Sequence, residues 1–169
     1  MSAIGTPGTT LRRAAVVACC GLLGLFAVLS YSAVLTKSAT YDEPMHALAG
    51  WLKLHRGDSR LDYESLPLPT RWAALANPAD AITFNASDEN WVQVPNDTYR
   101  GFALVTGTLY RTAGNDGAAF VNRSRLMMTL IGIALGALVI TWAWALGGAL
   151  TAVVAATLFC LDSALKSSA

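Results

Sequence analysis

Two neighbouring acids, Asp42 and Glu43, directly follow a long apolar stretch and are the residues most suited to chemistry in this sequence. Because they are adjacent, their side chains must diverge, so one can face a reactant while the other caps a helix. Near a membrane a carboxylate would be partly desolvated, which raises its pKa and suits a general base that activates an acceptor hydroxyl. The alternative is that both acids only stabilise a helix start through the helix macrodipole.

Four further residues are candidates for substrate binding: His46, Glu64, Arg71 and Arg125. Glu64 offers a second acid, or else a solvated loop residue. The two arginines match phosphate oxygens bidentately, although long basic side chains at a membrane interface also simply reach toward water. The Glu43-x-x-His46 spacing is only half of a metal site and no second half is evident, so we expect neither a metal ion nor a cofactor.

The elements that must position these residues are apolar helices. The 169-residue chain is 54% hydrophobic and only 14% charged, whereas soluble domains carry about 25% charged residues. Residues 14–36, 126–146 and 149–165 are the apolar segments, and the first uncharged run is roughly 33 Å long as a helix, enough for a bilayer core of about 30 Å. The predicted fold class is an α-helical integral membrane protein with three transmembrane helices. The net charge of +1 argues against an electrostatic nucleic-acid binder.

Charge bias predicts the topology. Arg12 and Arg13 precede the first apolar run, so residues 1–13 are expected to be a cytoplasmic tail, disordered over its first ten residues. Residues 37–125 then form a long extracytoplasmic loop that carries the acid pair. The apolar run is too long for a signal-peptide core, which favours a retained span. We therefore expect a multi-pass protein of the inner (plasma) membrane, with the lipid bilayer as a partner.

Within the loop, residues 44–56 are predicted to form a helix that Asp42 or Glu43 caps and Gly57 ends. Its apolar spacing indicates a helix lying along the membrane interface, with Trp51 at headgroup depth. Residues 70–76, which include Trp72, are expected to form a second interfacial helix. Residues 101–112 are expected to form a third short helix near the surface, and residues 77–98 to be irregular.

These residues combine into a recognisable pattern. The segment Tyr41-Asp42-Glu43-Pro44-x-His46-x-x-Ala49-Gly50, followed by Gly57-Asp58, resembles the first extracytoplasmic loop of bacterial GT-C glycosyltransferases of the protein-mannosyltransferase and lipid A aminoarabinose-transferase type (glycosyltransferase family 39). The downstream segments Gly114-Asn115-Asp116, Arg123 to Leu126, Trp142 to Gly148 and Leu161-Asp162 are similar to the same family's second and third spans.

The resemblance implies a polyprenyl-phosphate sugar as donor, Asp42 as the catalytic base and Glu43 as its support. Glu64 would begin the family's Glu-His-Pro-Pro-Leu motif, which here reads Glu64-Ser65-Leu66-Pro67-Leu68. Family members usually contain several hundred residues and many spans. The chain is therefore expected to be the N-terminal portion of a glycosyltransferase, inactive alone and completed by missing C-terminal spans or a partner chain. The alternative is a non-enzymatic small membrane protein whose extracytoplasmic loop binds a partner.

Overall fold

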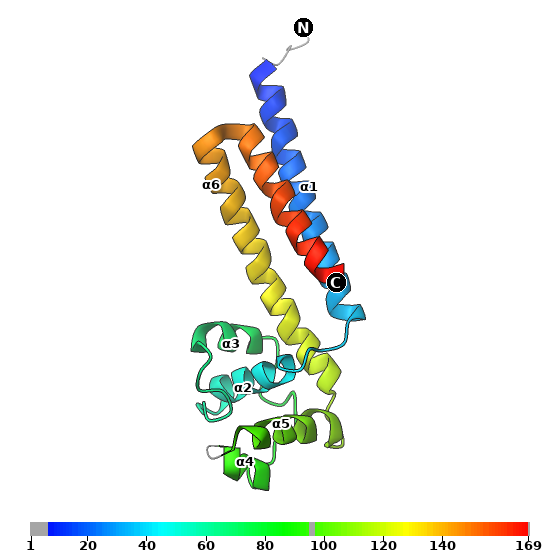
Figure 1. The fold of residues 1–169 in the computed structure, drawn as a ribbon, viewed down its shortest axis with the longest axis vertical. Helices are drawn as coiled ribbons and strands as arrows, with labels where there is room; N and C mark the ends of the chain where they lie inside the picture. The colour runs from blue at the N-terminus through cyan, green and yellow to red at the C-terminus, as the bar shows by residue number, and fades with distance from the viewer. Residues whose placement is uncertain (1–6, 95–96, 169) are drawn as a thin grey trace. The chain divides into compact units, whose positions relative to one another are not determined.

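The computed structural model describes residues 7–94 and 97–168, and these residues form helices and their connections without any strand. The helical class is therefore confirmed. The chain divides into an apolar unit, Met1–Leu35 with Thr129–Ala169, and a loop unit, Thr36–Met128. The elements, labelled in Figure 1, are α1 (Pro7–Thr36), α2 (Glu43–His55), α3 (Pro67–Ala74), α4 (Glu89–Gln93), α5 (Thr98–Thr106), the π-helix η2 (Gly107–Arg111) and α6 (Gly117–Ser168).

In the apolar unit, α6 turns back on itself and its second arm lies beside α1 (Figure 1). The turn is made at Gly148, whose φ of 78° and ψ of −163° are accessible essentially only to glycine. The returning arm packs on α1 through Phe26 and Phe159, with ring centroids 5.1 Å apart, and Cys160 Sγ donates to the Leu22 carbonyl at 3.5 Å. The turn therefore falls between the apolar segments 126–146 and 149–165 that the sequence indicates.

Two helices are long and apolar enough to cross a membrane, Thr9–Thr36 and Gly117–Leu161. Only 17% and 6% of their most apolar windows are buried. Their apolar side chains therefore face outward, which suits lipid rather than water. The three-span arrangement with an external loop stays a prediction. The side chain of Asp162 and the first six residues lie outside the described part of the chain, whereas residues 7–10, expected to be disordered, belong to α1.

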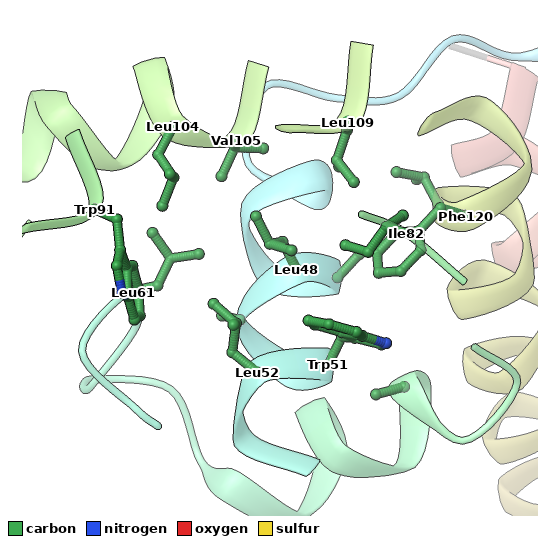
Figure 2. Packing of buried hydrophobic residues seen from close by; sticks show 14 of the residues in the cluster. Leu48, Trp51, Leu52, Leu61, Ile82, Trp91, Leu104, Val105, Leu109 and Phe120 are labelled. Carbon is green, nitrogen blue, oxygen red and sulfur yellow. The ribbon is translucent and has the colours of Figure 1, made fainter. Parts of the chain in front are cut away.

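The loop unit has its own hydrophobic core, built around α2 (Figure 2). Leu48, Trp51 and Leu52 of α2 are almost completely buried. They pack with Leu104 of α5 and Leu109 of η2. The predicted helix over residues 44–56 is confirmed as α2, but the expectation that Trp51 lies among lipid headgroups is wrong. Trp51 is 1% exposed and its Nε1 donates to the Pro78 carbonyl at 2.9 Å, so its ring faces the core and not headgroups.

Local signals explain most helix ends in this unit. Pro44 stands in the first turn of α2, and Gly57, with a φ of 65°, follows its end as predicted. Asp42 occupies the N-cap position but its side chain makes no cap hydrogen bond. The stretch 77–98 is less irregular than expected because Asp88 accepts from the Asn90 amide and starts α4.

The third predicted short helix also differs from expectation. It is divided into α5 and η2, and because Leu104 and Leu109 are buried it belongs to the core and not to the surface. Asp97 starts α5 by accepting from the Tyr99 amide at 2.9 Å. The apolar pattern thus predicted a helix, but it did not show that the apolar side of this helix packs in the protein core.

A buried asparagine ties the loop to α6. Asn77 Nδ2 donates to the Phe120 carbonyl at 3.1 Å and to Ser124 Oγ at 3.0 Å, and its Oδ1 accepts from Arg123 at 3.3 Å. Asn77 is fully buried, so these bonds replace the water that its amide would otherwise need. The start of α6 is therefore part of the loop unit's structure.

Gly50 of α2 lies against the backbone of α3, where an added Cβ would overlap the Thr70 carbonyl oxygen. We expect Gly50→Ala to force the helices apart and to lower the free energy of unfolding by about 1–3 kcal/mol, the usual cost of overpacking. The measurement is denaturant unfolding of the detergent-solubilised chain, followed by tryptophan fluorescence. The control is Gly107→Ala, because no atom lies within 4 Å of a Cβ there. Equal losses in the two variants would contradict the close contact.

Candidate functional site

The two neighbouring acids diverge, as their adjacency requires. Glu43 turns toward α6, where its Oε2 accepts from Arg125 Nε at 3.1 Å and Nη2 at 2.5 Å, and from the Thr40 amide at 2.9 Å. Arg125, whose side chain is 13% exposed, also donates to the carbonyls of Lys37 and Ser38, each at 2.9 Å. Glu43 and Arg125 therefore form a clamp that fixes the start of α2 and the segment before it to α6.

Asp42 points the other way, into solvent, with its side chain 64% exposed. Its Oδ1 accepts from Thr40 Oγ1 at 3.0 Å, and its Oδ2 lies 3.8 Å from His46 Nε2. The Thr40 hydroxyl, followed by nearby backbone amides and His46, lowers the pKa of Asp42 below its ordinary value. Within the folded chain, hydrogen bonds therefore outweigh the desolvation that would raise this pKa. Asp42 is ionised at neutral pH, which is the form that a general base requires.

His46 links this exposed carboxylate to a buried one. Its Nδ1 lies 2.9 Å from Asp62 Oδ2, and the Asp62 side chain is only 8% exposed. Lys53, 4% exposed, lies 3.9 Å from the same oxygen and donates to the Ser65 carbonyl at 3.3 Å. Asp42, His46, Asp62 and Lys53 form a line of alternating acid and base along one side of α2, which we call the polar line.

Asp62 is held ionised by its neighbours. Burial raises the pKa of Asp62, but hydrogen bonds from Ser65 and His46, together with the Lys53 charge, outweigh it and leave that pKa below its usual range. The Ser65 amide donates to Asp62 Oδ1 at 3.1 Å. With both of its oxygens engaged, Asp62 fixes the ring of His46, and His46 in turn faces the carboxylate of Asp42. The arrangement can orient one accessible base and favour its negative charge.

Among the described residues, no group of three or more His, Cys, Asp or Glu side chains is arranged to hold a metal ion. The polar line contains alternating charges, so its acids are already balanced by Lys53 and by the imidazole when that ring is protonated. The chemistry that this arrangement supports is proton acceptance at Asp42 by the carboxylate itself.

The remaining predicted site residues lie apart from this line. Glu64 is exposed and hydrogen-bonded to the neighbouring Tyr63, whose pKa it raises. Arg71 is exposed on α3. Within the described chain, neither makes a hydrogen bond or ion pair with Asp42 or His46. Asp42, Glu43, His46 and Arg125 are thus brought together at the start of α2, while Glu64 and Arg71 are not bonded into this group.

Sequence reasoning missed Lys53, Asp62 and Ser65. A signal existed for Lys53, because Asp42, His46 and Lys53 follow one another at spacings of four and seven residues, which places them on one side of a helix. Asp62 and Ser65 lie in the connection between α2 and α3, where no periodic pattern points to them. Only the packing of that connection against α2 shows their role.

The geometry defines a helical protein with an apolar unit and a separately packed loop unit, whose polar line ends in the accessible carboxylate of Asp42. Comparison of the chain with protein-family models, with curated proteins and with solved structures gave no match. The site must therefore be interpreted from its own residues.

Asp62→Asn should destabilise the chain at neutral pH and flatten its acid dependence. Because its pKa is lowered by folding, Asp62 contributes stability above about pH 4, and that contribution is lost as the pH falls through its folded pKa. The variant removes the negative charge of Asp62 that faces Lys53 and His46. We expect the free energy of unfolding to fall by about 1–3 kcal/mol at pH 7.

The measurement is unfolding free energy between pH 7 and pH 3, with the exposed Asp80→Asn as the matched control. We expect the difference between Asp62→Asn and the wild type to shrink as the pH falls, and Asp80→Asn to follow the wild type throughout. A constant difference across the whole range would show that the Asp62 charge contributes nothing.

Proposed function

We propose that the loop unit carries the catalytic base of a membrane glycosyltransferase that transfers a sugar from a polyprenyl-phosphate donor to an acceptor. The observation that carries this proposal is Asp42: an accessible, ionised carboxylate, held by Thr40 and His46, in the segment that leads from α1 into α2. A lipid-linked donor is confined to the membrane, and Asp42 follows the end of the apolar helix α1 by only six residues, so this base can meet it. The resemblance of the segment from Tyr41 to Gly50 to the GT-C family supports the same proposal.

In the proposed reaction, Asp42 accepts the proton of an acceptor hydroxyl as its oxygen attacks the anomeric carbon of the sugar. The bond between that carbon and the phosphate oxygen breaks, and the polyprenyl phosphate leaves with the bonding electrons. His46, fixed by Asp62, positions Asp42 and is close enough to favour its charge. Glu43 supports the site through its clamp on Arg125. Arg71 and Glu64 are proposed contacts to the donor phosphate and the acceptor.

The exposure of Asp42 indicates what else the reaction needs. With 64% of its side chain open, water reaches the carboxylate from several directions. Glycosyl transfer requires that donor and acceptor be fixed together and water excluded. We propose that further transmembrane spans, or a partner chain, supply the rest of the donor cavity.

A second function is favoured by a different observation. The loop unit has a complete core of its own, and one of the two acids is already occupied by Arg125. Such a unit also suits a non-enzymatic membrane protein that presents a folded loop to a partner. The two functions differ in whether replacement of Asp42 abolishes an activity or only changes one exposed surface residue.

For the location, we propose a multi-pass protein of the inner membrane with three spans, residues 14–36, 126–146 and 149–165, a cytoplasmic N-terminus and the loop 37–125 outside. The two apolar helices and the Arg12-Arg13 pair support this topology. Ser59→Cys, exposed in the loop unit, should be labelled by a membrane-impermeant thiol reagent in intact cells. Thr10→Cys should be labelled only after lysis. The reverse pattern would overturn the topology.

Asp42→Asn tests the proposed reaction. The amide has nearly the same shape but cannot accept the proton, so transfer should fall by roughly 10²–10⁴-fold, the usual range for a lost general base. The measurement is sugar transfer from a polyprenyl-phosphate donor by native membranes of cells whose sole copy carries the variant, which retains any partner chain. The control is Asp80→Asn, with full activity expected.

The outcomes separate the two proposed functions. If wild-type membranes show no transfer that depends on this chain, the glycosyltransferase proposal fails and the partner-binding function is favoured. If transfer is present and Asp42→Asn leaves it unchanged, the base is another group, and Glu43 is the next to replace.

A further inference from the structure

We propose that the exposed apolar side of the segment Leu66–Leu75, which contains α3, lies in the headgroup region of a lipid bilayer. This inference concerns the contact of the loop unit with lipid, and its tests do not depend on glycosyl transfer. The sequence predicted an interfacial helix over residues 70–76, and it gave the same location to α2 and Trp51, which are instead buried in the core.

The first observation is the exposure of large apolar side chains on this segment. Leu66, Leu68 and Leu75 are 74%, 79% and 55% exposed, and Trp72 is 36% exposed. The opposite side of α3, with Thr70, Ala73 and Ala74, is buried and packs on α2. The helix therefore has one side in the protein core and another side that is apolar yet uncovered, which is unfavourable in water.

The second observation is continuity with a candidate membrane helix. Trp72 Nε1 donates to the carbonyl of Met127 at 2.8 Å, and Met127 belongs to the candidate span Gly117–Leu161. Beside it on α6, Leu126 and Met128 are 39% and 44% exposed. The uncovered side of α3 is thus fixed next to an apolar stretch of α6 within the same unit. Tryptophan with its N–H engaged and its ring partly exposed is a typical interfacial residue.

The third observation is charge. Residues 66–79 contain a single charged side chain, Arg71, which is exposed. A lone cation among apolar side chains suits anionic lipid headgroups. Other exposed apolar residues of the loop unit have a different setting: Val92 stands on α4 beside Glu89, and Tyr99 lies between Asp97 and Arg100. Those positions are suited to water, and they provide the controls.

The experiment places a nitroxide spin label at Leu68→Cys or Leu75→Cys in the full chain, with Cys19, Cys20 and Cys160 replaced by alanine. The chain is reconstituted in vesicles of phosphatidylethanolamine and phosphatidylglycerol. We expect collisions with oxygen to exceed those with a water-soluble nickel chelate several-fold at both positions. Val92→Cys, 60% exposed, should show the reverse. Water-like accessibility at Leu68 and Leu75 would overturn the proposal, as would spin–spin broadening between molecules, which would assign this surface to a second copy.

A second measurement leaves the native cysteines in place. In vesicles with brominated acyl chains, Trp72→Phe should lower the fraction of tryptophan fluorescence that the lipid quenches, because it removes a quenchable ring. Trp91→Phe should raise that fraction, since Trp91 is 5% exposed and packs in the loop unit's core. If Trp72→Phe leaves the quenched fraction unchanged or raises it, Trp72 does not contact lipid and the proposal fails.

Discussion

The arrangement of the loop unit depends on Arg125, which joins three segments: the start of α2, the residues that follow α1, and α6. Its guanidinium bonds Glu43 at the start of α2 and the carbonyls of Lys37 and Ser38, while its own backbone belongs to α6. Five rigid donors make arginine suited to such a junction, and its low exposure protects the bonds from competition by water. Asp42 is placed between these anchored residues, so its position follows from the clamp and not from any capping bond of its own.

The polar line shows how a small unit accommodates charge beside its core. Lys53 and Asp62 are both nearly buried, an arrangement that costs desolvation energy unless each charge finds partners. Here the partners are shared: Ser65 donates its amide to Asp62 and its carbonyl accepts from Lys53. The connection between α2 and α3 is thereby fixed through its backbone. The imidazole of His46 lies between the buried Asp62 and the exposed Asp42, so Asp62 also fixes the ring that faces Asp42.

The sequence predicts those features that local backbone geometry determines, and it does not predict those that depend on packing against distant residues. Pro44 and Gly57 correctly marked the bounds of α2, because these residues act through local backbone geometry. The interfacial placement of Trp51 failed, because an apolar stripe has the same spacing whether lipid or protein covers it. Asp62 could not be found at all, since its partner His46 lies 16 residues earlier and its connection has no period. The candidate acids were recognisable, but their division into an anchored Glu43 and an accessible Asp42 required Arg125, which lies 82 residues beyond Glu43.

The close contact at Gly50 has a consequence for distances measured from lipid. Since no methyl group fits between α2 and the Thr70 carbonyl, the two helices pack at a distance that only glycine at position 50 permits. If α3 lies in the headgroup layer as proposed, this short distance also limits how far the start of α2, with Asp42, stands from the lipid. The missing side chain of a single glycine would then help to set the distance between the bilayer and the Asp42 carboxylate.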